Sequence, residues 1–277
     1  ILIKSYLEKM TRPQLFIVMV GGMSTVAGSV LAAYIGLLGG DDINEQLKFS
    51  THLLTASIMA APGAVAISKI IFPDIGKNIA RSVEIEKEKI NGNILLSITK
   101  GTIEGLRLAV NVGAMLLVFL AIIALFNDIM WLIGDLFGLN VLISESTNFD
   151  KLSIEFILGY LFSPIMWLIG VSLEECALMG QLLGVKIVSS EFVAFIKLAN
   201  FKNISASVNF LSQKSIAMAT FMLCGFANFA SIGIQIAGIG VLAPSQRKNL
   251  SELGFKAMIA GTIVSLVSAC FAGILIS

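Results

Sequence analysis

The chain has 277 residues, of which 56% are hydrophobic and 13% charged, and its mean hydropathy is +0.91. A soluble globular domain carries about 25% charged residues, so this composition excludes an ordinary soluble domain, and its low charge excludes a disordered chain. Nineteen basic and eighteen acidic residues leave a formal charge of +1. This charge gives no strong positive electrostatic potential that would indicate nucleic-acid binding. We therefore expect an all-α integral membrane protein.

Six stretches of the chain contain no Asp, Glu, Lys or Arg, and each is long enough to cross a bilayer. A transmembrane helix needs about 20 mostly apolar residues. The stretches are 13–40, 49–68, 108–127, 156–173, 215–246 and 257–277. Four of them match one crossing each, whereas the first and the fifth are too long for one plain helix. The densest charge lies between Pro73 and Lys100, and its mixed signs predict a polar connector with a solvated helix face.

The two long stretches each contain small and polar residues near their middle. Gly21–Ser29 interrupts the first, and Gly225–Gly233 interrupts the second. Glycine loosens a helix, and Ser, Thr and Asn side chains can satisfy the backbone groups that unwinding frees. Paired interruptions in two halves of a chain indicate the midplane binding site of a transporter. For either segment alone, close helix packing through small residues is the alternative.

Glu191 is the carboxylate that lies deepest in apolar sequence, within the stretch 187–196. A charged group in a membrane segment is costly and usually faces a cavity or a partner. Two interpretations remain open. Either Glu191 lies at a hairpin tip in contact with water, or it accepts hydrogen bonds from a polar substrate.

The sequence offers little for other chemistry. His52 is the only histidine, and the three cysteines stand alone in apolar sequence, where a thiol acts as a small core residue. A membrane enzyme would need a nucleophile and base or a metal cluster, so we expect no enzyme and no organic cofactor. A channel or a non-transporting membrane subunit remains a more remote alternative.

Several motifs, in chain order, resemble those of concentrative nucleoside transporters. They are Gly21–Val30, Ala56–Pro62, Asn111–Met115, Glu191–Ala194, Cys224–Ile232 and Ala257–Gly273. The resemblance runs over essentially the whole chain and is bacterial in style. It implies a scaffold and a transport domain with helical hairpins and two broken transmembrane helices, arranged as inverted repeats. It also implies an elevator-like, sodium-driven symporter for nucleosides such as uridine, assembled as a homotrimer and surrounded by lipid in the cytoplasmic (inner) membrane.

The resemblance also divides the chain. It implies that 1–12 end the first hairpin, that 13–72 hold the first broken helix and its neighbour, and that 73–102 form a polar, interfacial connector. Residues 103–138 then form a scaffold helix and an interfacial helix, and 139–277 hold the second hairpin, the second broken helix and the last helix.

Binding residues follow from the matching motif positions. The resemblance implies that Glu191, Asn228 and Ser231 hold the ribose, because an ionised carboxylate is a pure acceptor and Asn and Ser offer both hydrogen-bonding functions. Phe226 and Leu108 are implied to line the site, and Val30 to lie beside the base.

The coupling ion is implied to bind at the first break. Thr25 would contribute its hydroxyl and carbonyl, and Val26 its carbonyl. Oxygen dipoles of this kind can replace the hydration shell of Na⁺. Some relatives use protons instead, so sodium is favoured and proton coupling remains the alternative.

The family's first hairpin carries a Gln-Thr-Glu stretch for the base and an Asn for the cation, and this chain starts after both. Residue 1 is Ile, so we expect the natural N-terminus to lie upstream. Transport is accordingly expected of the parent protein.

Overall fold

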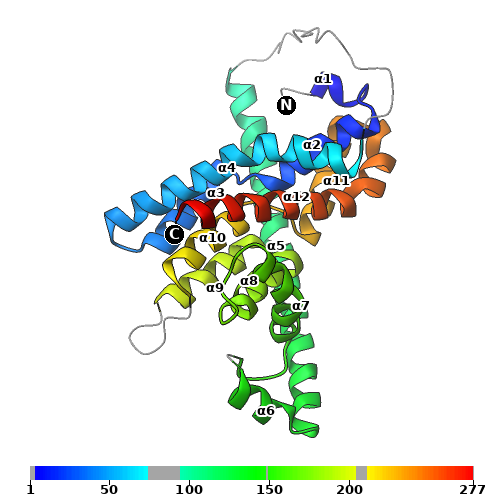
Figure 1. The fold of residues 1–277 in the computed structure, drawn as a ribbon. Coiled ribbons are helices and arrows are strands. Elements are labelled where there is room, and N and C mark those ends of the chain that lie inside the picture. The colour runs from blue at the N-terminus through cyan, green and yellow to red at the C-terminus, as the bar shows by residue number, and fades with distance from the viewer. Residues whose placement is uncertain (1–3, 74–93, 148, 204–210, 277) are drawn as a thin grey trace.

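A computed structural model describes residues 4–73, 94–147, 149–203 and 211–276, and within these ranges the chain is helical with no strand (Figure 1). The helices are α1 Lys4–Leu7, α2 Arg12–Ser24, α3 Gly28–Gly39, α4 Ile43–Ile71, α5 Ile94–Leu136, α6 Leu139–Ser146, α7 Ile154–Leu168, α8 Cys176–Val188, α9 Glu191–Asn203, α10 Gln213–Leu223, α11 Phe229–Leu242, the short 3₁₀ helix η1 Pro244–Gln246, and α12 Arg247–Leu275. The predicted all-α fold is confirmed.

The first broken helix consists of α2 and α3. A reciprocal capping box between Thr11 and Gln14 begins α2, with a proline in its first turn. The helix ends at Ser24, because Thr25 has extended backbone angles, and α3 resumes at Gly28. The break therefore falls inside the interrupted segment that the sequence predicts.

The second broken helix consists of α10 and α11. Ser212 caps α10, which ends at Leu223. Gly225 follows with φ +144°, a conformation that L side chains rarely adopt. Asn228 then caps α11 by accepting a hydrogen bond from the Ser231 amide. The predicted second break is confirmed, and it is two residues longer than the first.

Two groups of buried apolar side chains form the core, and the chain passes between them at each break. The first group contains Tyr34 and Met218, and the second contains Met19 and Ala227. Thus α2 packs in the second group and α3 in the first, whereas α10 packs in the first and α11 against the second. The two broken helices cross the core in opposite directions, as an inverted repeat requires. The last helix, α12, contacts α2, α4, α10 and α11 (Figure 1).

A helical hairpin carries Glu191 toward these breaks. The α8 helix runs to Val188, residues 189–190 form the tip, and α9 returns from Glu191. At the opposite end of α8, Glu175 accepts hydrogen bonds from Ser172, Ser212 and Ser215. Burial raises the pKa of Glu175, but these hydrogen bonds outweigh it and hold the pKa below its ordinary value. The carboxylate therefore joins the start of α8 to the start of α10.

The long helix α5 includes the end of the predicted connector and most of the predicted scaffold and interfacial segment. It begins at Ile94, so the described end of the predicted 73–102 connector is helical; residues 74–93 lie outside the described part. It continues to Leu136, so the interfacial helix expected before Gly138 is part of α5. The chain bends at Gly138, where φ is +68°, and α6 follows at 98° to the end of α5. Charged residues mark where apolar burial stops and do not by themselves end a helix, so α5 continues through both segments.

Two of the described helical segments are long and apolar enough to cross a bilayer, namely Ile43–Ile71 and Pro244–Leu275. A third is possible if the bent pair Ala121–Leu136 and Leu139–Ser146 counts as one span. The halves of the broken helices are shorter than a bilayer is thick, so each broken helix needs both halves to cross.

Candidate functional site

The two helix breaks lie against each other. A Cβ atom at Gly225 would be 2.9 Å from the carbonyl oxygen of Ser24 and 3.1 Å from that of Met23. Those two residues end α2, so only a glycine lets the second break approach the end of the first half-helix this closely. The close approach brings two half-helix ends to one place in the core.

Glu191 lies between the broken helices and is 4% exposed. Its Oε1 accepts a hydrogen bond from the Tyr34 hydroxyl at 3.2 Å, and its Oε2 accepts one from Asn228 Nδ2 at 3.0 Å. Tyr34 belongs to α3, and Asn228 precedes α11. The carboxylate therefore connects the hairpin tip to the second half of each broken helix.

Asn228, which donates to Glu191, also accepts hydrogen bonds from Ser231. Its Oδ1 accepts hydrogen bonds from the Ser231 amide and from the Ser231 hydroxyl, both at 2.8 Å. Both side chains are buried. The three polar residues that the sequence predicts for ribose thus form one hydrogen-bonded series, Glu191–Asn228–Ser231. Their role in binding stays a prediction.

Tyr34 is a site residue that the sequence analysis missed. It is fully buried, and its ring stacks on Phe195 with centroids 4.2 Å apart and an interplanar angle of 26°. One signal was available: Tyr34 lies four residues after Val30, which places both on one helix face. A buried tyrosine hydroxyl usually finds a partner, and here the partner is Glu191.

Two of the predicted apolar residues have described side chains, one in the second break and one just after the first. Phe226 is in the second break and is partly buried, and Val30 packs from the first turn of α3 against the core group that contains Tyr34. Leu108 falls within α5, but its side chain lies outside the described part of the structure.

Thr25 and Val26 occupy the first break, as predicted, and both are partly buried. The Thr25 hydroxyl donates to the Gly21 carbonyl at 3.0 Å, so the lone pairs of its oxygen stay available. The carbonyl end of α2 carries partial negative charge. The break therefore offers oxygen atoms of the kind that a hard cation prefers.

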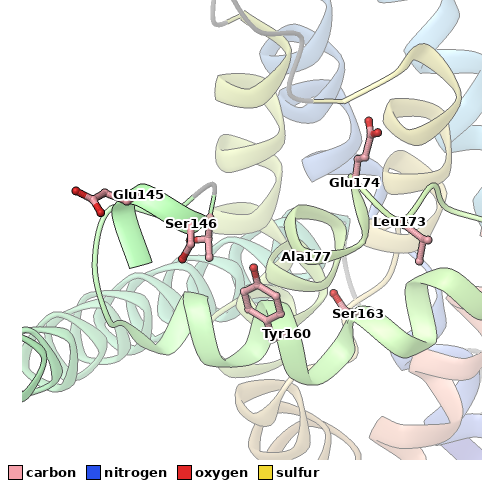
Figure 2. Close-up of a pocket in the computed structure, with 8 residues that line it drawn as sticks. Glu145, Ser146, Tyr160, Ser163, Leu173, Glu174 and Ala177 are labelled. Carbon is pink, nitrogen blue, oxygen red and sulfur yellow. The ribbon is translucent and has the colours of Figure 1, made fainter. Parts of the chain in front are cut away.

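A polar pocket of about 380 Å³ lies elsewhere, between α6, α7 and the turn before α8. Tyr160 and Ser163 line it from α7, and Figure 2 shows Glu145 and Glu174 on opposite sides of it. None of the predicted site residues lines it. Its two carboxylates do not converge on a common point, so we assign it no ligand.

Paired broken helices that cross in opposite directions, with a buried carboxylate between them, are the arrangement found in helical membrane carriers. The known proteins to which the chain is similar give the particular family. Residues 52–273 match the family described as "Na+ dependent nucleoside transporter C-terminus", and the chain belongs to this family of concentrative nucleoside transporters.

Relatives with curated names are similar over the whole chain. The chain is 40% identical to the transporter YutK of Bacillus subtilis and 38% identical to a transporter of Haemophilus influenzae, and each match includes all of the chain. It is 34% identical over 99% of its length to sodium/nucleoside cotransporter 1 of the mouse. These relatives are transporters, in agreement with the prediction that the protein is not an enzyme.

Solved structures agree with the fold. The structure of CNTnw in an inward-facing substrate-bound state is 36% identical and matches all of the chain with a TM-score of 0.81. An outward-facing structure of CNTnw with two substitutions matches 98% of the chain with a TM-score of 0.80. The chain covers 61% of the first of these structures, 63% of YutK and 41% of the mouse protein.

Proposed function

We propose that the protein to which this chain belongs takes up nucleosides across the cytoplasmic membrane as a secondary active symporter driven by sodium. The observation that carries this proposal is the buried Glu191 carboxylate, hydrogen-bonded to both broken helices and aligned with Asn228 and Ser231. The name of the mouse relative, a sodium/nucleoside cotransporter, supports both the substrate class and the ion.

The chemistry of the series suits a ribose. Each hydroxyl of the sugar can donate to Glu191, which accepts only, while Asn228 and Ser231 can donate to or accept from a neighbouring hydroxyl. A ribose entering here exchanges the Asn228–Glu191 hydrogen bond for bonds of its own. A ligand without the hydroxyl leaves a buried carboxylate with an unmade bond, which costs about 1–3 kcal/mol. Specificity for the sugar follows from that cost.

The apolar residues suit the rest of the ligand. Phe226 in the second break and Val30 in the first turn of α3 are both partly buried, and a flat, partly apolar base can pack against such side chains. We propose the same lining role for Leu108. The choice between purine and pyrimidine belongs to the first hairpin, so uridine is the probe with which to begin.

Sodium is the coupling ion that the first break fits best. Thr25 and Val26 supply a hydroxyl and backbone carbonyls beside the negative end of α2, and these groups bind Na⁺ without a change in protonation. Coupling to protons is the second candidate. The buried carboxylate of Glu191 favours it, because an acid within a transport path can carry a proton.

The whole protein is proposed as a homotrimer in a bacterial inner membrane, with α5 as the scaffold helix. The hairpin and the two broken helices would then move together, as an elevator, past that scaffold. The contacts that join the hairpin, α3 and α11 through Glu191 support treating them as one moving unit.

The test is uptake of labelled uridine by the full-length parent in proteoliposomes, with sodium and pH gradients imposed separately. Uphill uptake driven by inward sodium alone is the expected result. Uphill uptake driven by protons alone would contradict the proposed sodium site and would still support nucleoside transport. No uphill uptake under either gradient, with a known relative as positive control, would overturn the proposal.

The substitution Glu191→Gln tests the site itself. It keeps the shape of the side chain and removes the charge, so uridine binding should weaken by roughly 10- to 100-fold, the equivalent of a charge-assisted hydrogen bond. Glu145→Gln, on exposed α6, is the matched control and should bind as the parent does. Unchanged binding by Glu191→Gln would contradict the assignment of the ribose site.

A further inference from the structure

Lys186 is fully buried and takes no part in the site described so far. It lies in the last turn of α8, one turn before the hairpin tip. Its Nζ donates to the carbonyl oxygen of Met222 at 2.8 Å and to the Ser265 hydroxyl at 3.3 Å. A charged lysine inside a membrane protein is costly, so these contacts indicate a function for the ammonium group.

The ammonium group lies at the carbonyl end of α10. Met222 is the penultimate residue of that helix, whose unsatisfied carbonyls carry partial negative charge where the second break begins. Ser265 extends the contact, because its hydroxyl lies 3.4 Å from the carbonyl oxygen of Cys224, the first residue of the break. Lys186 therefore neutralises the end of α10 at the point where the chain unwinds.

The corresponding end of α2 is arranged differently. In the part of the chain that the structure describes, the last turn of α2 contains no basic residue. The Gly21 carbonyl accepts from the hydroxyls of Ser24 and Thr25, and the Met19 carbonyl accepts from the neutral amide of Gln235. This is the break at which the sodium ion is proposed to bind.

The other two half-helices also end on a tethered cation. Lys202 donates to the Leu38 carbonyl at the end of α3, at 2.7 Å. Arg247 donates to the Gly240 carbonyl near the end of α11, at 3.0 Å. Three of the four half-helices therefore have a cationic side chain at their carbonyl end, and α2 has none among the described residues.

We infer that Lys186 is a built-in cation at the second break, which does for α10 what the coupling ion does for α2. The ammonium group holds the carbonyl end of α10 in place while Gly225 turns the chain, and it supplies positive charge near Glu191, with which it interacts electrostatically. Lys186 is thus a positioning residue, which acts on the ribose site through the backbone of the second break. This inference rests on the proposed function.

The first test is uridine binding by the purified full-length parent, with Lys186→Met as the variant. Methionine fills nearly the same space and removes the charge. We expect uridine affinity to fall by about tenfold or more, the magnitude of a buried charge at a helix end. The matched control is Lys151→Met, an exposed lysine before α7, which should leave binding unchanged. Wild-type affinity and wild-type sodium dependence in Lys186→Met would overturn the inference.

The second test separates a cation from a packing residue. Lys186→Ala leaves a space beside the Met222 carbonyl and Ser265 that added ethylammonium can fill. We expect ethylammonium to restore uridine binding in Lys186→Ala and to do nothing for Lys186→Met, where the space is occupied. A folded Lys186→Ala protein that binds uridine weakly with and without the amine would assign Lys186 a structural role and overturn the inference.

Failure of the proposed function is distinguishable from failure of this inference. If the wild-type parent binds no nucleoside, the proposed function fails. If the wild type binds uridine and both Lys186 variants bind it as tightly as the wild type does, only the inference fails.

Discussion

At the scale of single residues, the buried Glu191 carboxylate has hydrogen-bond partners that still leave it capacity for a ligand. Each oxygen of the Glu191 carboxylate accepts one hydrogen bond, from Tyr34 or from Asn228, although a carboxylate has about four acceptor positions. The two donors come from α3 and from the N-cap of α11, and the carboxylate itself begins α9, so these hydrogen bonds depend on how the three elements are placed. Changes at these donors should therefore affect ligand affinity more than overall folding.

The Tyr34 hydroxyl provides a direct prediction. Tyr34→Phe keeps the ring that stacks on Phe195 and removes one donor to Glu191. Uridine affinity should fall about fivefold, which corresponds to ~1 kcal/mol for one hydrogen bond. Binding titrations of the purified parent measure this. Tyr160→Phe, at an exposed tyrosine of α7, is the control; an equal effect of both changes would contradict a specific role for Tyr34.

The Thr25 hydroxyl provides a second prediction at this scale. Thr25→Val keeps the branched shape and removes an oxygen from the first break, so the sodium concentration for half-maximal uptake should rise by about tenfold. Thr25→Ser retains the hydroxyl and should behave as the parent does. Uptake at varied sodium concentration and fixed pH is the measurement. A sodium half-saturation that Thr25→Val leaves unchanged would remove Thr25 from the cation site.

At the scale of elements, the breaks are more than weak points in two helices. Thr25 ends α2 with extended backbone, and Asn228 starts α11 with its side chain as the cap. Gly225 turns the chain between α10 and α11 with its backbone against the end of α2. Because the two breaks touch, a change in one is transmitted to the other through the backbone.

Gly225→Ala tests this contact. The new methyl group would meet the Ser24 carbonyl at 2.9 Å while the backbone is held at φ +144°, so the protein should lose about 1–3 kcal/mol of stability. Gly233→Ala is the control, because nothing lies within 4 Å of a Cβ there and alanine favours the helix. Thermal unfolding in detergent compares the two. If Gly225→Ala melted at or above the temperature of Gly233→Ala, the close approach of the breaks would be wrong.

At the scale of the whole molecule, α5 runs behind the other helices in the view of Figure 1 and reaches beyond them to α6. Its 43 residues extend about 65 Å, twice the hydrocarbon thickness of about 30 Å, so the helix must tilt or project from the bilayer. Large apolar side chains are exposed along it, among them Leu117, Leu125 and Leu136. Lipid or neighbouring copies must cover these side chains.

We predict that copies of the chain associate through α5, in keeping with the proposed homotrimer. Native mass spectrometry of the full-length parent in mild detergent should give three chains in one particle. Cysteines introduced in pairs along exposed positions of α5 should cross-link chains, whereas cysteines on exposed positions of α4 should not. A particle of one chain, with no α5 cross-links in membranes, would exclude this assembly.

The sequence determined the class of the protein and the places of its two breaks. Apolar runs longer than one membrane crossing, each divided by Gly, Ser, Thr or Asn, specify broken helices through local backbone chemistry, and the motifs identified Glu191, Asn228 and Ser231 together. Local chemistry could not place the bend at Gly138 instead of earlier, because charge changes do not end helices.

Tyr34 and Lys186 acquired their partners only in the tertiary structure. Met222, Ser265 and Glu191 lie 36, 79 and 157 residues along the chain from the donors that reach them. Only the packing of the hairpin and α12 with the two broken helices in one core brings such distant groups together.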